Sequence, residues 1–349
     1  MAIARKKLFD PTHGPWIHAI NRCVRRAHLC GGRDGRYDHR RGWMEDRLEL
    51  LTRVFACEVA AYAVMSNHLH VVVRMRPQET GEWGADEVCR RWMSIFPRNY
   101  LSDGTPVLPS DATIVAQAAD WRWVAEKRSR LADLGWFMRS LKEPIARRAN
   151  REDKCTGAFW EGRFDSIPLL DQPALIACMA YVDLNPIRAK MAATPEASRH
   201  TGIRQRIRAR QREMATERVA TRGGEAALAR SGLKDAGAAP RAWVVAVETC
   251  IVGEALANKR ISTDDYLTLV DATGRVIRPG KRGAIPASLA PILARLDLQV
   301  EDWIATMLGW RQMRGSAVGG CGARIAEATR RGTRWVKNHC PLFGRGAAA

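Results

Sequence analysis

The segment Asn67–Met75, with the sequence NHLHVVVRM, limits the fold more than any other part of the chain. Its three consecutive valines favour a β-strand, because β-branched side chains lose rotamer freedom in a helix. Successive side chains of a strand point to opposite faces of the sheet. His68 and His70 therefore share one face, and Leu69 and Val71 point to the other. We expect that other face to be buried in a core.

The two histidines of this strand are candidate metal ligands. The rise of a strand places them within about 7 Å of each other, close enough to share a divalent ion. Two surface or hydrogen-bonded histidines at a sheet edge explain the spacing equally well. A structural zinc site needs four ligands, so two histidines alone do not complete one. If a metal binds here, further ligands come from elsewhere and open positions remain for water or substrate, as in a catalytic site.

The order of predicted elements indicates an α+β fold. An apolar segment precedes the histidine strand, and strands and helices alternate around it. This order predicts helices packed on one antiparallel sheet, compatible with a split βαβ, ferredoxin-like unit. The further predicted elements are a strand at 16–23, a helix at 43–57, a helix at 134–150 kinked at Pro144, a strand at 159–169, and a helix from Asp171 to Asn185.

Composition divides the chain into three predicted parts. Residues 1–192 form the core, interrupted at about 77–133 by a partly helical insertion rich in tryptophan and charge. Residues 193–240 are a basic helix followed by a Gly- and Ala-rich linker that begins at 223. Residues 241–349 regain apolar periodicity, and we expect a small helical domain there, with DNA binding as one role for it.

The charge of the chain points to a polyanionic partner. Its 349 residues carry a formal net charge of +19, which opposes compaction unless a polyanion lies nearby. A basic protein without such a partner is the alternative. Hydrophobic residues at 46% exclude disorder throughout. Nine scattered cysteines without a C-x-x-C pair, and no long apolar stretch, predict a soluble, cytoplasmic protein with reduced thiols.

The helix that begins after Asp171 carries the second notable pattern, AYVDLNPIRA at 180–189. Asp171 is a favourable N-cap, and Pro173 suits a first turn. Helical spacing predicts a buried face made of Leu175, Ile176, Met179 and Val182. Tyr181 and Asn185 are four residues apart and fall together outside that face. A tyrosine at the rim of the core, with the asparagine ending the helix before Pro186, is the simpler explanation of this pattern.

Together, the two segments resemble a known family. YAVMSNHLHVVVR at 62–74 and AFWEGRF…AYVDLNPIRAKM at 158–191 are similar to the single-tyrosine HUH transposases, above all to the REP-associated tyrosine transposases. His68-Leu69-His70 matches the HUH motif. Tyr181, ahead of Asn-Pro-Ile-Arg, matches the nucleophile, and Asn185 matches a position that helps to ligate the metal. The resemblance covers about 14–76 and 134–192, and leaves the insertion and the C-terminal third unexplained.

The resemblance implies cleavage and rejoining of single-stranded DNA, at hairpin sequences, through a 5′-phosphotyrosine on Tyr181. Because a phenol has a pKa of about 10, it is a poor nucleophile at neutral pH. Mg²⁺ or Mn²⁺ held by His68, His70 and Asn185 would polarise the scissile phosphate. Small relatives form homodimers and others act as monomers, so both states stay open.

Several arginines are candidate DNA contacts. Arg163 and Arg188 lie close in sequence to the two motifs and could hold phosphates. Every second residue from 204 to 212 is arginine, and a helix would place Arg204, Arg208 and Arg212 on one side. Such a stripe suits the DNA backbone, and a solvated charged linker is an equal alternative. The insertion's tryptophans could stack on unpaired bases, although most are expected to cover the core.

Two other classes of function compete with the transposase. The first is a domesticated relative that holds hairpin DNA or RNA without cutting it. The second is a metal hydrolase acting on small molecules, which the charge and the lack of a third nearby histidine or carboxylate disfavour. Retention of His68, His70, Tyr181 and Asn185 together favours an active enzyme, because a binding protein has no need of all four.

Overall fold

The computed structural model describes residues 14–32, 35–99, 101, 106–230, 243–250, 261–277, 299–310 and 317–337, with only the backbone given for 218–230. Four strands form one antiparallel sheet in the order β2-β3-β1-β4. The strands are β1 (Trp16–Arg22), β2 (Cys57–Val64), β3 (His68–Met75) and β4 (Asp165–Leu169). The predicted α+β class and the strand at His68–Met75 are confirmed.

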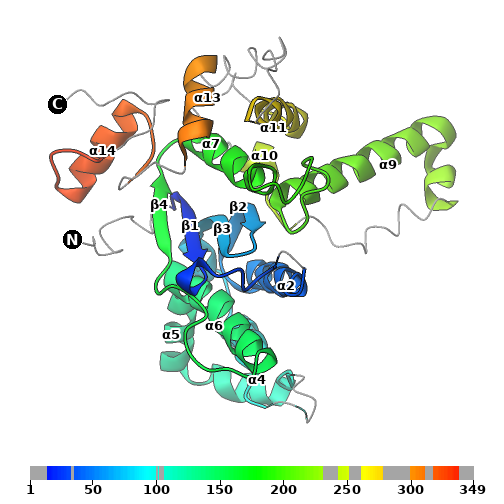
Figure 1. Ribbon diagram of the computed structural model, residues 1–349. Coiled ribbons are helices and arrows are strands. Elements are labelled where there is room, and N and C mark those ends of the chain that lie inside the picture. The colour runs from blue at the N-terminus through cyan, green and yellow to red at the C-terminus, as the bar shows by residue number, and fades with distance from the viewer. Residues whose placement is uncertain are drawn as a thin grey trace.

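Helices surround this sheet on both sides (Figure 1). Those up to β4 are η2 (Val24–Arg26), α2 (His39–Val54), η3 (Pro77–Gly81), α3 (Ala85–Ile95), α4 (Asp111–Ala118), α5 (Trp121–Leu131) and α6 (Leu134–Glu152). Those after β4 are α7 (Gln172–Asp183), α8 (Asn185–Arg188), α9 (Gly202–Arg230), α10 (Val247–Cys250), α11 (Thr263–Ile277), α13 (Val300–Gly309) and α14 (Cys321–Arg331).

The sheet separates two hydrophobic clusters, so the core has three layers. On one face, Leu69 and Val71 of β3 pack with residues of α2 and α6. On the opposite face, Val72 packs with α7 and with the C-terminal helices. The alternation predicted for β3 is thus observed, and His70 lies on the α7 side, where its ring contacts that of Tyr181. Both faces are covered, which is why β3 is buried along most of its length.

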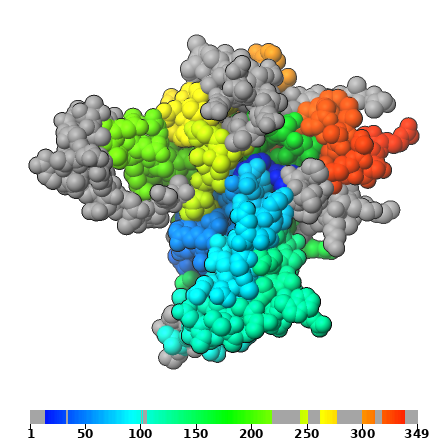
Figure 2. Space-filling model, turned by 180° about the vertical axis from the view of Figure 1, so that it is seen from behind, coloured from blue at the N-terminus to red at the C-terminus, as the bar shows by residue number. Residues whose placement is uncertain are grey.

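The insertion forms a helical lobe beside α2 and α6, at the lower end of the molecule in both views (Figures 1 and 2). Its helices α3, α4 and α5 pack on one another and on α2 and α6. Trp92 is buried there, and the centroid of its ring lies 4.6 Å from that of Phe96 and 5.5 Å from that of Trp136. Trp121, in contrast, is 71% exposed. Most of the insertion's tryptophans therefore cover the core, as expected.

Helix α7 begins as predicted but is more buried than predicted. The backbone N–H of Ala174 donates to Asp171 Oδ1 at 2.9 Å, so Asp171 is the N-cap, and Pro173 lies in the first turn. Every residue from Ala174 to Asp183 is buried. The expectation that Tyr181 lies outside the buried face is wrong, because the C-terminal helices α11 and α13 cover the side of α7 that the sheet leaves open.

The C-terminal part is joined to the core at several points. Val318 forms a parallel bridge with Leu169, so the segment before α14 extends the sheet at the β4 edge. The N–H of Val318 donates to the carbonyl of Pro168 at 3.0 Å, and the N–H of Leu170 donates to the carbonyl of Val318 at 2.8 Å. One hydrophobic cluster contains residues of the sheet, of α7 and of the C-terminal helices. The three-part division of the chain stays a prediction, and its parts share a core.

Helix α9 projects from the body of the molecule as an arm (Figure 1). It confirms the predicted basic helix and continues to Arg230, so it includes the first residues of the segment expected to be a linker from 223. The remainder of that linker and the C-terminal tail lie outside the described residues. Within the part of the chain that the structure describes, no helix is long and apolar enough to cross a membrane.

Candidate active site

Four aromatic rings from three separate elements meet on the α7 side of the sheet. His68 and His70 come from β3, and their ring centroids are 4.8 Å apart. The ring of Tyr181, from α7, lies 5.7 Å from that of His70 at an interplanar angle of 89°. The fourth ring is His18 of β1, at 5.1 Å from His70 and 6.2 Å from Tyr181. The structure therefore brings together the two histidines and the tyrosine that the sequence singled out.

His70 is held by one hydrogen bond and leaves one ring nitrogen unused. Its Nδ1 lies 2.9 Å from Nε2 of His18. Its Nε2 is buried and, among the described residues, has no hydrogen-bond partner. Buried polar atoms are nearly always paired, so an unpartnered imidazole nitrogen indicates a place for a ligand. Burial lowers the pKa of His18 to about 3 and places the pKa of His70 well below its ordinary value, with His68 adding to the effect in both. Both rings are therefore neutral, the form that binds metals.

His68 is oriented by the residue before it. Nδ1 of His68 lies 2.6 Å from Oδ1 of Asn67. Nδ2 of Asn67 in turn donates to the backbone carbonyl of Arg26 at 3.1 Å. The amide is thus fixed with its oxygen toward the imidazole, so Nδ1 of His68 carries a proton, and Nε2 is the nitrogen that a metal would use.

Tyr181 is enclosed between two side chains. The ring of Trp310, directly after α13, is stacked on it with centroids 5.3 Å apart and an interplanar angle of 26°. The guanidinium carbon of Arg188 lies 5.0 Å from the centroid of the same ring. Only 5% of Tyr181 is exposed. The contact with Trp310 was not predicted, because it joins positions far apart in the sequence.

Asn185 lies one turn after Tyr181, at the start of α8. Its Nδ2 donates to the backbone carbonyl of Tyr181 at 3.3 Å, and the residue is buried. This hydrogen bond leaves the amide oxygen as the atom that could reach a metal. Arg188, three residues further on, contributes to the lowering of the His70 pKa, so its charge lies near the histidines.

Positive charge flanks the histidine cluster. Arg22 pairs with His68 in the register of β1 and β3, and with Arg188 it helps to lower the pKa of His70, after burial and the neighbouring histidines. Nη1 of Arg22 also lies 3.1 Å from Oδ2 of Asp165. Two guanidinium groups beside neutral imidazoles create a potential that attracts an anion such as a phosphate.

A buried carboxylate anchors the tyrosine helix to the C-terminal part. Asp183 is fully buried, and it accepts hydrogen bonds from the Tyr266 hydroxyl at 2.6 Å and from the N–H of Ile203 at 3.0 Å. Arg206 lies 3.9 Å away, and it also donates to the carbonyls of Ala60 and Val245. Asp183 stands between Tyr181 and Asn185, so this network fixes the segment that carries both.

The other predicted DNA contacts are Arg163 and three arginines of α9. Arg163 is exposed in the turn before β4. Arg204, Arg208 and Arg212 lie on α9, which leaves the body of the molecule (Figure 1). They occupy the side of α9 opposite to Arg206, which is buried. Burial and the charges of Arg208 and Arg199 lower the pKa of Arg204, and the nearby Glu45 acts in the opposite direction.

The donor set fits an open metal site rather than a closed one. Among the described residues, no group of three or more His, Cys, Asp or Glu side chains is placed to hold a metal ion. The predicted ligands are two imidazoles and one amide, and the unpartnered Nε2 of His70 agrees with that set. Three protein ligands would leave coordination positions for water and phosphate oxygens.

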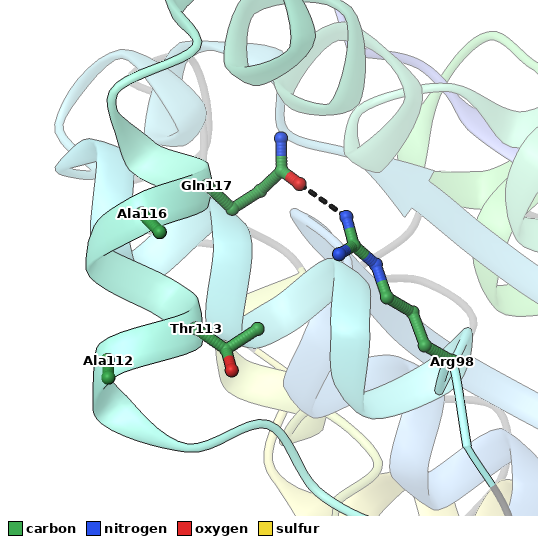
Figure 3. Close-up of a pocket in the computed structure, with 5 residues that line it drawn as sticks. All are labelled: Arg98, Ala112, Thr113, Ala116 and Gln117. Atoms are coloured by element: carbon green, nitrogen blue, oxygen red, sulfur yellow. Dashed lines mark hydrogen bonds between the residues drawn. The ribbon is translucent and has the colours of Figure 1, made fainter.

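A shallow pocket lies on the helical insertion. It is lined by Arg98 and α4 residues, and Arg98 donates to Oε1 of Gln117 at 2.5 Å (Figure 3). Its other lining residues are Ala112, Thr113 and Ala116. These side chains include no base and no strong nucleophile, so the histidine cluster is the better candidate for chemistry.

Comparisons with known proteins found one distant likeness. No protein-family model matches the chain, and no curated protein matches it. Among solved structures, it is similar to a REP-associated tyrosine transposase bound to a REP hairpin. The identity is 12%, the TM-score is 0.35, and the match covers 59% of this chain and 86% of the other. A likeness this distant carries no conclusion about what this chain does.

Proposed function

We propose that this chain is a metal-dependent single-tyrosine endonuclease and transposase that cleaves and rejoins single-stranded DNA. One observation carries the proposal: the Tyr181 ring lies 5.7 Å from that of His70, on the sheet face that also holds His68. Elements more than 100 residues apart in sequence supply the phenol and the imidazoles. The strand order β4-β1-β3-β2, with α2 and α6 in a β-α-β-β-α-β sequence, supports the ferredoxin-like form of the core.

His68, His70 and Asn185 would hold the divalent ion, Mg²⁺ or Mn²⁺. The bound ion would neutralise the developing charge on the scissile phosphate and orient that phosphate. Nε2 of each imidazole is the ligating atom, because Nδ1 of each is engaged by Asn67 or His18. The two neutral imidazoles suit Mn²⁺, and the amide oxygen suits either ion.

The chain's own groups would carry the remaining steps. Tyr181 Oη loses its proton to solvent and forms a bond to phosphorus, the P–O3′ bond breaks, and the departing O3′ takes up a proton. One DNA fragment then ends in a 3′-hydroxyl, and the other stays on the enzyme as a 5′-phosphotyrosine. Arg22 and Arg188 hold the negative charge of the phosphate beside the tyrosine. Attack of a second 3′-hydroxyl on the phosphotyrosine then releases Tyr181 and rejoins the strand.

The partner proposed for this site is hairpin-bearing single-stranded DNA. The net charge of +19 supports a polyanionic partner. The exposed arginines of α9 and Arg163 would contact its backbone outside the histidine cluster. Arginines that contact only phosphates do not read bases, so these contacts would add affinity rather than sequence preference.

The test is the covalent intermediate. Full-length protein is incubated with 3′-labelled single-stranded hairpin DNA and Mn²⁺, because the fragment that stays on Tyr181 carries the 3′ end, and adducts are resolved on denaturing gels. We expect a protein–DNA adduct that Tyr181→Phe abolishes and His70→Ala reduces at least tenfold. Tyr37→Phe, a tyrosine change outside the cluster, should leave the adduct intact. A Tyr181→Phe variant that still forms the adduct would overturn the assignment.

One observation favours a second function, the binding of hairpin nucleic acid without cleavage. Tyr181 is 5% exposed and lies between Trp310 and Arg188, so a DNA phosphate has no direct approach to it in this conformation. The same assay separates the two functions. Tight hairpin binding without an adduct at any Mn²⁺ concentration supports the binding protein.

A further inference from the structure

The two histidines of β3 are each hydrogen-bonded through Nδ1, but by different kinds of partner. His68 faces the amide oxygen of Asn67 at 2.6 Å, and that oxygen can only accept. His70 faces Nε2 of His18 at 2.9 Å. An imidazole nitrogen either donates or accepts, so the proton between these two rings can belong to either one. Its location decides which nitrogen of His70 has a free lone pair.

We propose that His18 is a positioning residue: its Nε2 accepts a hydrogen bond from His70 Nδ1 and thereby keeps the lone pair of His70 on Nε2, where a divalent metal would bind. The inference rests on the proposed function, in which His70 is a ligand. Metal-bound histidines commonly donate their other N–H to an acceptor that fixes their tautomer and orientation. His18 would supply for His70 what the Asn67 amide supplies for His68.

The position of His18 in the sheet suits this role. β1 and β3 are antiparallel, with His18 opposite Val72 and Ile20 opposite His70, so His18 and His70 are diagonal neighbours on one face. Their rings are stacked at 5.1 Å with an interplanar angle of 26°. His18 is 1% exposed, which keeps water from competing for the hydrogen bond.

The two possible tautomers of the His18–His70 pair differ in whether Nε2 of His70 can bind a metal. If His18 donates, His70 carries its proton on the buried Nε2 and cannot use that nitrogen as a ligand. If His70 donates, Nε2 has its lone pair, and the proton of His18 lies on its own Nδ1. Both Nδ1 of His18 and Nε2 of His70 lack hydrogen-bond partners among the described residues, so protein contacts favour neither arrangement. Only the second arrangement is compatible with the proposed metal ligand at Nε2 of His70.

The experiment measures the tautomer and the metal separately. Full-length protein with ¹⁵N-labelled histidine is studied by NMR, which distinguishes Nδ1–H from Nε2–H. Mn²⁺ affinity is measured by calorimetry without DNA. His18→Gln retains an acceptor at this position, and His18→Phe keeps a ring without one. His28→Phe makes the same change at an exposed histidine and serves as the control.

We expect His70 to carry its proton on Nδ1 in the wild type and in His18→Gln. In His18→Phe we expect the proton to move to Nε2, with Mn²⁺ affinity at least tenfold weaker. The Gln variant and the His28 control should stay within about threefold of the wild type. A simple packing role for His18 would not produce rescue by Gln.

Two results would overturn the inference alone: an Nε2–H tautomer of His70 in the wild type, or wild-type Mn²⁺ affinity in His18→Phe when His70→Ala no longer binds Mn²⁺. A wild-type protein that binds no Mn²⁺ and forms no DNA adduct would instead overturn the proposed function. Because the tautomer is measured without metal, these failures are distinguishable.

Discussion

At the scale of single residues, the tyrosine segment depends on a carboxylate that sequence patterns do not mark as important. Burial raises the pKa of Asp183 to about 6, while the charge of Arg206 and hydrogen bonds from Tyr266 and Ile203 act in the opposite direction. A group buried this deeply needs every partner it has, since removing one hydrogen bond leaves a polar atom unsatisfied. The hydroxyl of Tyr266 therefore helps to fix the segment that carries Tyr181, although the two tyrosines lie far apart in the sequence.

We expect Tyr266→Phe to destabilise the protein by roughly 1–3 kcal/mol, because it removes the 2.6 Å hydrogen bond to Asp183 and leaves that oxygen buried without a donor. Urea unfolding followed by circular dichroism measures the change. Tyr37→Phe, the same substitution at a partly exposed position, should change stability by less than about 0.5 kcal/mol. Equal effects of the two changes would show that the Asp183 contact contributes nothing specific.

The candidate site was only partly predictable from the sequence. Strand alternation placed His68 and His70 on one face, and the resemblance to a known family selected Tyr181. His18 could not be paired with His70 in advance, because their contact depends on the register between β1 and β3. Trp310 could not be placed over Tyr181 either, since no periodic pattern connects positions in separate helices. The roles of these side chains in metal and DNA binding stay predictions.

At the scale of elements, α9 has one inward and one outward side. Arg206 is buried and donates to two backbone carbonyls, and Arg210 makes two 2.8 Å contacts with the carboxylate of Asp264. Arg204, Arg208 and Arg212 occupy the other side, where like charges lie close together. Alternate arginines thus lie on two sides: Arg206 and Arg210 join the arm to the body, and we expect the other three to contact a polyanion.

Replacing Arg204, Arg208 and Arg212 together by alanine should weaken hairpin DNA binding without unfolding the protein. Each phosphate that the protein no longer neutralises reduces the slope of log K against log salt by about 0.9, so the slope should fall by up to roughly 3. Fluorescence anisotropy at several salt concentrations measures this slope. Arg206→Ala should instead reduce stability by about 3 kcal/mol or more, because it empties a buried polar position. An unchanged slope in the triple variant would exclude these arginines as phosphate ligands.

The base of the arm is held by Glu45 of α2. Its carboxylate accepts from the Tyr62 hydroxyl at 2.5 Å and lies 2.6 Å from Nδ1 of His200. Burial alone would raise the pKa of Glu45, but the hydrogen bonds from His200 and Tyr62 outweigh it, and the pKa is lowered. The charged form therefore stabilises the fold at pH values above the unfolded pKa of about 4.3, and this stabilisation is lost as pH falls through the lower folded value.

We expect Glu45→Gln to be less stable than the wild type by roughly 1–2 kcal/mol at pH 7, since an amide replaces a charged acceptor. The difference should shrink as the pH falls below about 4, because the wild-type carboxylate is then protonated. Chemical unfolding of both proteins between pH 3 and 7 gives this comparison. A difference in unfolding free energy between the two proteins that stays constant from pH 3 to 7 would contradict the lowered pKa of Glu45.

Helices and strands with a local signal were the easiest elements to predict. The N-cap at Asp171 and the β-branched run at Val71–Val73 are set by neighbouring residues, and both occur where expected. The environment of α7 was harder to predict, because its second buried side faces helices α11 and α13, which begin 80 and 117 positions after α7 ends. An amphipathic pattern reports which side of a helix is apolar, and not which distant element covers the remaining sides.

At the scale of the whole molecule, the C-terminal part is a cover for the histidine and tyrosine cluster. α11 and α13 pack on α7, and the Trp310 ring lies against the Tyr181 ring. In the proposed reaction, substrate would reach Tyr181 only after this cover shifts. The position of α13 would then control the rate of the proposed reaction.

Trp310→Leu should accelerate formation of the DNA adduct severalfold under limiting DNA, because a smaller side chain exposes the Tyr181 ring. Rapid-quench measurement of the adduct at several DNA concentrations gives the rate. Trp335→Leu removes a 68% exposed tryptophan from the same part of the chain and should leave the rate unchanged. A slower or unchanged rate in a folded Trp310→Leu variant would show that Trp310 does not limit access.

The attachment of the cover can be tested at Gly319, beside the bridge between Val318 and Leu169. A Cβ at this position would lie 2.8 Å from the Cβ of Leu170, closer than packed atoms allow. Gly319→Ala should therefore destabilise the protein by about 1–3 kcal/mol and increase proteolysis within the C-terminal part. Gly322→Ala adds a methyl group where nothing lies within 4 Å, inside α14, and should be neutral or stabilising. Similar behaviour of the two variants would contradict close packing at Gly319.

The pairing of Val318 with Leu169 has a practical meaning for anyone who shortens this protein. A fragment ending near residue 192 would leave β4 with a bare outer edge, ready to join the same edge of another molecule. It would also expose to solvent the side of α7 that α11 and α13 bury in the full chain. We expect such a fragment to contain both motifs and yet precipitate, so the two motifs alone do not define where the chain can be shortened.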